Sequence, residues 1–280
     1  MPDTATTKTG WAAFWDRGGW WKALLAAAVY LALYNGASLL IGLLFGSRLD
    51  AANLFATPQS VFFGLALPVI VGSIILLAFL VSVRWLKPLF SRQPIRGRGW
   101  MWIAPALAAA AILLRLFGTD YGAYSAGTIA VTFVAGIFIG FSEEVLTRGI
   151  AVTLLRKHGY SELAVMLLSS LIFALLHASN LLLGQPVLTV LLTMGFTFVF
   201  GVCMYLTLRV TGNLIYPIIL HALTDPATFL ATGGIDTGAG GPESPLLPLA
   251  GAAVWGYLIL TVVALFLVRG RVGKAAALTQ

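Results

Sequence analysis

Residues 126–157 read AGTIAVTFVAGIFIGFSEEVLTRGIAVTLLRK, an apolar run interrupted by two adjacent glutamates and an arginine. About 20 apolar helical residues are enough to cross a bilayer core. The helix either ends at Phe141 and leaves the acids outside the membrane, or continues to Leu155, with Gly159 as its stop. The second interpretation is favoured, because the residues after the arginine are again apolar apart from one threonine. The stretch therefore predicts a long helix that carries ionisable side chains inside the bilayer.

The rest of the chain has the same character. Of its 280 residues, 59% are hydrophobic and only 10% are charged, whereas soluble domains carry about a quarter charged residues. The apolar runs do not alternate with period two, so transmembrane strands are not indicated. We predict an all-α, polytopic transmembrane helical bundle of about eight spans, namely residues 23–45, 61–83, 100–117, 126–155, 163–183, 187–208, 214–230 and 246–268.

The positions of the basic residues predict the orientation of these spans. Lys and Arg gather in every second connection, and the intervening loops are nearly free of them. The positive-inside rule then places both termini in the cytoplasm, and the short loops fit a prokaryotic plasma membrane. The net charge of +7 accordingly indicates membrane lipid as a partner and not nucleic acid. The single cysteine, Cys203, excludes an internal disulfide framework.

This pattern also predicts how the chain is organised. The expected units are a cytoplasmic segment at 1–22, three N-terminal transmembrane helices in 23–125, a catalytic helical core at 126–230, an outer Gly/Pro-rich loop at 231–245, and a last helix with a basic tail at 246–280.

Ionisable residues inside the membrane are the candidate functional residues, because each costs ~2.5–3.5 kcal/mol to insert. Glu143 lies about 13 residues from the basic end of its helix, and His177 about 14 residues from the inner end of the next, or ~20 Å in each case. His221 lies about 7 residues from the inner end of its helix, or ~10 Å. With ordinary helix tilts these three can meet at a similar depth, toward the cytoplasmic half of the membrane. We therefore expect the active site to open toward the cytoplasm.

Helical spacing suggests a role for each side chain. Glu144 and Arg148 share a face at i,i+4, and this pairing would let both charges stay in a low-dielectric environment. Glu143 points about 100° away and has no oppositely charged partner on its own helix. Such a carboxylate is suited to accept a proton as general base. His221 and Asp225 are again i,i+4 and share a face.

These residues form three motifs in order, Glu143-Glu144-x-x-x-Arg148, Phe173-x-x-x-His177 and His221-x-x-x-Asp225. Together they resemble the motifs of the CPBP intramembrane proteases, the CAAX-processing and bacteriocin-processing enzymes also called the Abi family. The resemblance covers roughly residues 126–230. It implies hydrolysis of a peptide bond near the membrane, with a membrane-associated peptide or a lipidated, CAAX-like protein tail as substrate.

The resemblance also implies residue roles. Glu143 and His177 would activate the attacking water, His221 and Asp225 would polarise the scissile carbonyl, and Glu144 and Arg148 would support the first helix. The last motif often has Asn in the place of Asp225, and an ionised Asp cannot donate a hydrogen bond to an oxyanion. If the family chemistry is metal-dependent and not glutamate-dependent, Glu143, His177, His221 and Asp225 would make an N/O ligand set for Zn²⁺.

Two other classes of function stay open at this point. A non-catalytic membrane scaffold or immunity factor would keep the same polar core. A proton-coupled transporter would also need buried Glu, His and Arg, although the chain shows no internal repeat and its intramembrane charges are nearly all in one half.

Overall fold

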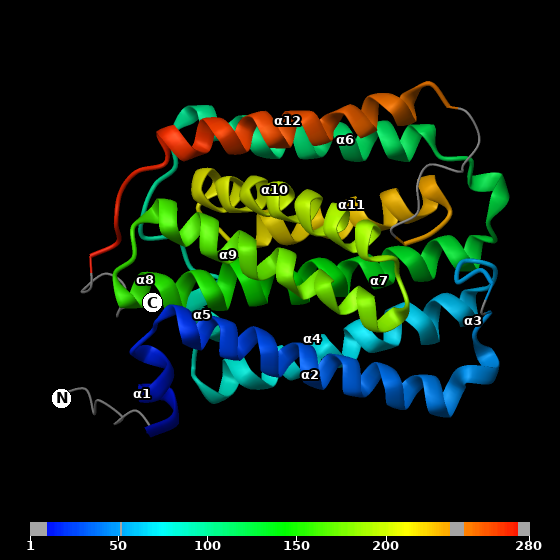
Figure 1. The fold of residues 1–280 in the computed structure, drawn as a ribbon, viewed down its shortest axis with the longest axis horizontal. Helices are drawn as coiled ribbons and strands as arrows, with labels where there is room; N and C mark the ends of the chain where they lie inside the picture. The colour runs from blue at the N-terminus through cyan, green and yellow to red at the C-terminus, as the bar shows by residue number, and fades with distance from the viewer. Residues whose placement is uncertain (1–9, 51, 236–243, 274–280) are drawn as a thin grey trace.

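The computed structural model describes residues 10–50, 52–235 and 244–273, and these ranges contain helices and no strand. Successive long helices run antiparallel along the longest axis of the bundle (Figure 1). The elements are α1 (Gly10–Asp16), α2 (Trp20–Phe45), η1 (Gly46–Arg48), α3 (Pro58–Val61), η2 (Phe62–Ala66), α4 (Leu67–Ser82), α5 (Leu86–Leu89), η3 (Gly99–Trp102), α6 (Ile103–Gly118), η4 (Tyr121–Ala123), α7 (Ala126–Glu144), η5 (Val145–Ala151), α8 (Val152–His158), α9 (Glu162–Leu176), η6 (His177–Leu183), α10 (Val187–Thr211), α11 (Ile215–Thr232) and α12 (Leu246–Leu267).

The predicted all-α membrane bundle is confirmed, with one difference in the number of spans. In the described part of the chain, seven helical segments are long and apolar enough to cross a membrane. The eighth expected span forms α11, which has 18 residues but is not among the seven. Its mean hydropathy is lowered by His221, Asp225 and Pro226. Because α11 packs against α7, α6 and α10, its polar side chains are sheltered from lipid by protein.

The long-helix interpretation of residues 126–157 is confirmed, since α7, η5 and α8 follow one another without a break from Ala126 to His158. Ser125 caps the start, because its side chain accepts a hydrogen bond from the Thr128 backbone N–H. Gly159 ends the helix in the left-handed region, with φ 89°, where glycine carries no Cβ penalty. The predicted stop residue is therefore correct.

Two glycines on α7 allow α11 to approach closely. A Cβ added at Gly140 would lie 2.5 Å from the backbone nitrogen of Ala222, and one at Gly136 would lie 2.5 Å from the Ala222 carbonyl oxygen. Glycines four residues apart let two membrane helices touch backbone to backbone. This contact brings the acidic pair on α7 next to the polar face of α11.

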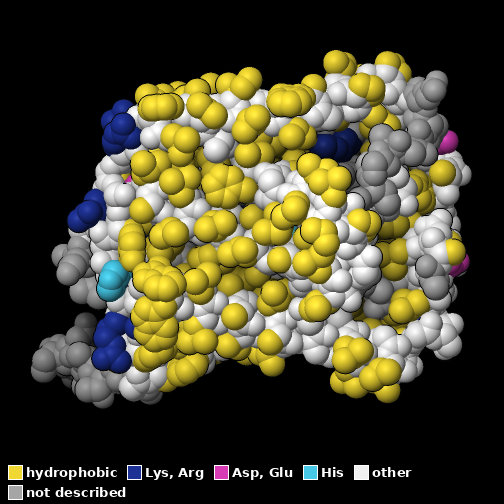
Figure 2. Space-filling view, viewed as in Figure 1, with side chains coloured by type: hydrophobic (Ala, Val, Ile, Leu, Met, Phe, Trp, Pro, Cys, Tyr) yellow, Lys and Arg dark blue, Asp and Glu magenta, His cyan; other side chains and the backbone are white. Residues whose placement is uncertain are grey.

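Both described ends of the chain pack at the same end of the bundle. The Gly19 N–H donates to the Leu154 carbonyl at 2.9 Å, and the Glu162 N–H donates to the Gly270 carbonyl at 2.9 Å. Figure 2 shows Lys and Arg side chains at this end and a broad hydrophobic surface over the middle of the bundle. The arrangement agrees with two termini on one side of the membrane; that this side is cytoplasmic stays a prediction. The expected loop at 231–245 and the basic tail lie largely outside the described residues.

Some of the basic residues that predicted the orientation are buried at this end. Arg156 and Arg209 both bind the fully buried Glu162, with nitrogen–oxygen distances of 2.7 and 3.0 Å. Tyr205 also donates to Glu162, and Lys157 pairs with Asp16 at 3.0 Å. These side chains join α8, α9, α10 and the N-terminal segment, so they stabilise the bundle in addition to marking its end.

Candidate active site

The two glutamates stand where the long helix changes its winding. Glu144 is the last residue of α7, and the following turn, Val145–Ala151, is a π-helix. The Thr147 hydroxyl donates to the Glu143 carbonyl at 2.5 Å across this turn. Single π turns inside α-helices are frequent at functional sites, but a hydrophobicity pattern does not reveal them. The sequence analysis, which assumed 100° per residue throughout, did not anticipate this turn.

Glu144 contacts more than the arginine with which it was expected to pair. Its Oε1 accepts from Arg148 Nη1 at 3.0 Å, as the i,i+4 spacing predicted, and from His221 Nδ1 at 2.8 Å. The side chains of Glu144 and Arg148 are fully buried. Because a carboxylate only accepts, the Nδ1 of His221 carries the proton in this bond. Glu144 therefore orients the histidine of the third motif from the helix of the first.

Arg148 occupies a closed compartment between helices. Its guanidinium lies 4.5 Å from the centre of the Phe173 ring, and its Nη1 also donates to Thr147 Oγ1 at 2.6 Å. Its Nε and Nη2 have no hydrogen-bond partner among the described residues. Gly201 on α10 makes room for it, since a Cβ there would come within 2.9 Å of Nη2. Glu144 is the one carboxylate that forms an ion pair with Arg148 among the described residues, so the buried charge of Arg148 depends on Glu144 for its compensation.

His221 is buried behind the two carboxylates that face the open space. Its Nε2 lies 3.5 Å from Glu143 Oε2 and 3.6 Å from Asp225 Oδ2. The edges and faces of Phe173 and Phe200 enclose the ring, with centroids 5.6 and 5.1 Å away. The structure thus brings the residues of the first and third motifs together through His221.

His177 presents one nitrogen to the site. It begins η6, where the helix tightens from α to 3-10 winding. Its Nδ1 lies 3.1 Å from the Phe173 carbonyl oxygen, which can only accept, so Nδ1 carries the proton and Nε2 keeps its lone pair. The predicted span at 163–183 is found as one span that consists of α9 followed by η6, and His177 stands at their junction.

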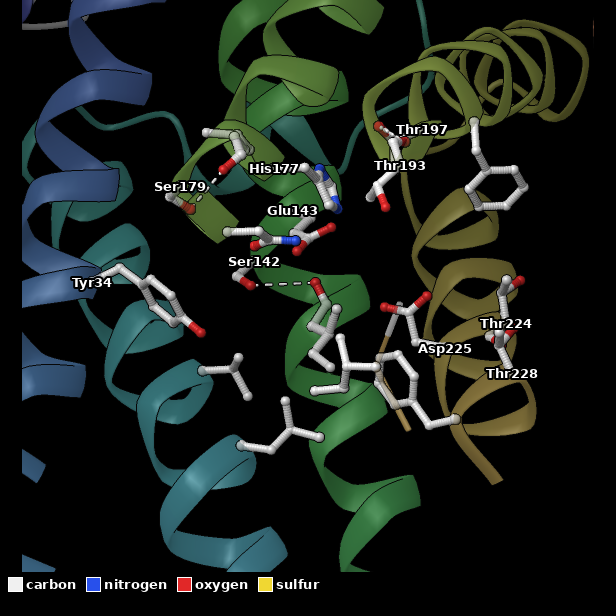
Figure 3. A pocket seen from close by; sticks show the side chains of 18 of the residues that line it. Tyr34, Ser142, Glu143, His177, Ser179, Thr193, Thr197, Thr224, Asp225 and Thr228 are labelled. Atoms are coloured by element: carbon white, nitrogen blue, oxygen red, sulfur yellow. Dashed lines mark hydrogen bonds between the residues drawn. The ribbon is translucent and has the colours of Figure 1, made fainter. Parts of the chain in front are cut away.

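A cavity of about 640 Å³ lies beside these residues and contains Glu143, His177 and Asp225 in its wall. Figure 3 shows Glu143 next to His177, with Asp225 reaching toward them from α11. The Glu143 and Asp225 side chains are 25% and 23% exposed, against 2% for His221. Glu143, His177 and Asp225 can therefore touch a bound molecule, whereas Glu144, Arg148 and His221 lie behind them and are absent from the cavity wall.

The cavity also has lining residues that sequence reasoning missed. Tyr30 and Tyr34 on α2 both line the cavity and stack with ring centres 6.1 Å apart. Figure 3 shows Tyr34 across the cavity from Asp225. Threonines line the walls that α10 and α11 contribute. The tyrosines gave no signal because they lie in an apolar run far from the motifs. The threonines did leave a signal in the sequence, since those on α11 recur every fourth residue next to Asp225.

The cavity occupies the half of the bundle away from the basic end. Its lining comes from the start of α4, the ends of α9 and α11 and the start of α10, which lie opposite α1, α5 and α8 (Figure 1). The sequence analysis expected the active site to open toward the cytoplasm at the basic end. The lining residues lie toward the other end of the bundle, and the side of the membrane to which the cavity opens stays a prediction.

The zinc-dependent alternative for these residues stays a prediction. Across the described residues, no group of three or more His, Cys, Asp or Glu side chains is placed to hold a metal ion. His221 uses Nδ1 for Glu144, and its Nε2 lies deeper than the carboxylates it faces. The site as it stands has two histidines and two carboxylates next to one cavity.

A helical membrane bundle with a buried cluster of Glu, Arg and His beside a cavity is typical of proteins that perform chemistry or transport inside the membrane. Comparison of the sequence with known protein families points to one family within this class. Residues 125–227 match the family described as Rce1-like, type II CAAX prenyl endopeptidase Rce1-like. This segment runs from the cap of α7 into α11 and contains all three motifs, so the similarity of the chain to this peptidase family covers the helices that carry the candidate site. Comparison with curated proteins and with solved structures found no match.

Proposed function

We propose that this protein is an intramembrane endopeptidase that hydrolyses peptide bonds of membrane-associated or lipidated, CAAX-like substrates in a prokaryotic plasma membrane. The observation that carries the proposal is that Glu143, His177 and Asp225, from three different helices, line one cavity inside the helical bundle. A scaffold does not need a partly exposed carboxylate beside a histidine with a free nitrogen, and a transporter is disfavoured because the chain shows no internal repeat. The family match over the same residues supports the peptidase interpretation.

In the proposed reaction, Glu143 accepts a proton from a water molecule that also donates to Nε2 of His177. The water oxygen forms a bond with the scissile carbonyl carbon, and the carbonyl oxygen becomes an oxyanion. Asp225 on α11 is protonated in this reaction, and its hydroxyl donates a hydrogen bond to that oxygen. Glu143 then passes its proton to the departing amine nitrogen as the C–N bond breaks, which leaves a carboxyl group on one product. Glu144 and Arg148 act indirectly, by holding His221 behind the two cavity carboxylates.

The first test compares the wild type with Glu143→Gln and His177→Ala. The probe is a fluorogenic peptide that ends in a farnesylated cysteine followed by three apolar residues, presented to the detergent-purified protein. Each change should lower kcat by about 10²–10⁴-fold, the usual contribution of a general base. His158→Ala is the matched control, because this third histidine stacks on Tyr160 at the basic end and does not line the cavity.

A second measurement covers substrates that the probe does not resemble. Proteome-wide mapping of new protein termini compares cells that carry the wild type with cells that carry Glu143→Gln at matched expression. A small set of membrane-associated termini should depend on the intact glutamate. Cleavage of the peptide at equal rates by the wild type and Glu143→Gln, together with unchanged termini, would remove the peptidase proposal in favour of a scaffold or a transporter.

A further inference from the structure

Threonines form two columns along the cavity wall, one on each of two neighbouring helices. In each column the residues recur at a spacing of four, so they lie on one helical face. Figure 3 shows two members of each column, with the α11 pair beside Asp225. All six line the same cavity as Glu143 and His177, and they are Thr189, Thr193 and Thr197 on α10 and Thr224, Thr228 and Thr232 on α11.

The three threonine hydroxyls of the α11 column already donate their protons to backbone carbonyls of their own helix. Thr224 donates to the Leu220 carbonyl at 2.8 Å, Thr228 to the Thr224 carbonyl at 2.7 Å, and Thr232 to the Thr228 carbonyl at 3.0 Å. A hydroxyl has one proton to donate and two lone pairs that accept. The α11 column therefore lines the cavity with hydrogen-bond acceptors and not with donors.

An extended peptide is the ligand that suits such a row of acceptors. It carries a backbone N–H at every residue apart from proline, and inside a membrane each of these needs a partner. In the described residues no strand offers an edge with which a peptide could pair, and helix interiors use their own carbonyls. Side-chain acceptors on a helix face can replace that edge.

The spacing of the column also fits an extended chain. Threonines four residues apart on an α-helix are separated by ~6.0 Å along its axis, and alternate residues of an extended chain by ~6.6 Å. Over the eight residues from Thr224 to Thr232 the column spans ~12 Å, the length of three to four extended residues. Thr224 precedes Asp225 directly, so the column begins at the depth of the cavity carboxylates and leads away from them.

We propose that Thr224, Thr228 and Thr232 form a peptide subsite that accepts hydrogen bonds from alternate backbone N–H groups of an extended substrate next to the scissile bond. The inference rests on the proposed peptidase function and adds how the substrate is held. Recognition through backbone N–H groups does not depend on side-chain identity. The subsite therefore sets the conformation of the substrate and its register against Glu143, and leaves the choice of sequence to other contacts.

The test pairs a change in the protein with a change in the peptide. Thr228→Val keeps the shape of the side chain and removes its acceptor, whereas Thr228→Ser keeps the hydroxyl. The peptide is the farnesylated probe, together with single-ester versions in which one backbone N–H near the scissile bond is replaced by oxygen. Affinities are measured on the Glu143→Gln background, which does not require cleavage, and kcat/KM is measured on the otherwise wild-type protein.

A neutral hydrogen bond corresponds to a factor of about two to ten in affinity, so Thr228→Val should weaken binding of the all-amide peptide by that factor, and Thr228→Ser should restore most of it. One ester position should bind less well to the parent protein and lose nothing more in Thr228→Val. Thr261→Val is the control, because Thr261 on α12 makes the same bond to its own helix, to the Tyr257 carbonyl at 2.8 Å, without lining the cavity.

The outcomes separate this inference from the proposed function. If the protein cleaves the probe and Thr228→Val weakens every ester and the amide peptide equally, the threonines act structurally and the subsite is refuted while the peptidase stands. If no peptide binds to the Glu143→Gln protein, the subsite is refuted as well. Coupling between Thr228 and one N–H, without cleavage by the wild type, would keep a peptide-binding cavity and refute the peptidase.

Discussion

Replacing Gly140 with alanine tests whether the contact between α7 and α11 sets the geometry of the site. The added Cβ would lie 2.5 Å from the Ala222 nitrogen and 2.7 Å from the Ile218 carbonyl oxygen, whereas ordinary contact begins at 3.4 Å. Both neighbours are backbone atoms, so the clash is relieved only if the helices separate by about 1 Å. Overpacking of this kind costs about 1–3 kcal/mol, and a displacement of 1 Å at a reacting centre costs about 10²-fold in rate.

Gly140→Ala should therefore lower the apparent unfolding temperature in detergent and also the cleavage rate per folded molecule. Gly195→Ala on α10 is the matched control, because a Cβ there meets nothing within 4 Å and alanine favours the helix over glycine. Thermal unfolding and peptide cleavage are measured on the same preparations. If Gly140→Ala lost stability but kept wild-type turnover per folded molecule, the claim that this helix contact aligns Glu143 with Asp225 would be refuted.

The charged side chains of the bundle give three further predictions. Glu144→Ala should lower the free energy of unfolding by about 3–5 kcal/mol because it leaves the charge of Arg148 uncompensated. The double change Glu144→Leu with Arg148→Met should recover the unfolding temperature but not cleavage, since His221 has lost its partner. Recovery of both would contradict the role of Glu144 in orienting His221. Asp225→Asn should keep cleavage within about tenfold, because an amide can donate to an oxyanion, while Asp225→Leu should abolish it; equal loss in both would count against the oxyanion role. Glu162→Ala should lower the unfolding temperature, because it removes the counter-charge of two buried arginines. Turnover per folded molecule should stay within about threefold of the wild type. A loss of turnover without a loss of stability would instead link this end of the bundle to catalysis.

The features that could be predicted from the sequence are those that depend on neighbours along one helix. Apolar runs of about 20 residues predicted the helices, because the bilayer demands that length. The spacing of Glu144 and Arg148 predicted an ion pair that forms at 3.0 Å, because four residues make about one turn. Gly159 predicted the end of the long helix, because glycine takes up left-handed backbone conformations freely.

Features that depend on how helices pack against one another appear only in the tertiary structure. The bond between Glu144 and His221 joins residues 77 positions apart, and no periodicity along the chain encodes it. The same holds for the tyrosines of α2 that face the cavity and for the half of the bundle in which the cavity lies. The sequence by itself determined a helical membrane protein with its polar residues in three ordered motifs. Only the tertiary structure decided which of those residues line the cavity, because that depends on the rotation and separation of neighbouring helices. Close contacts such as Gly140 against Ala222 set that rotation and separation.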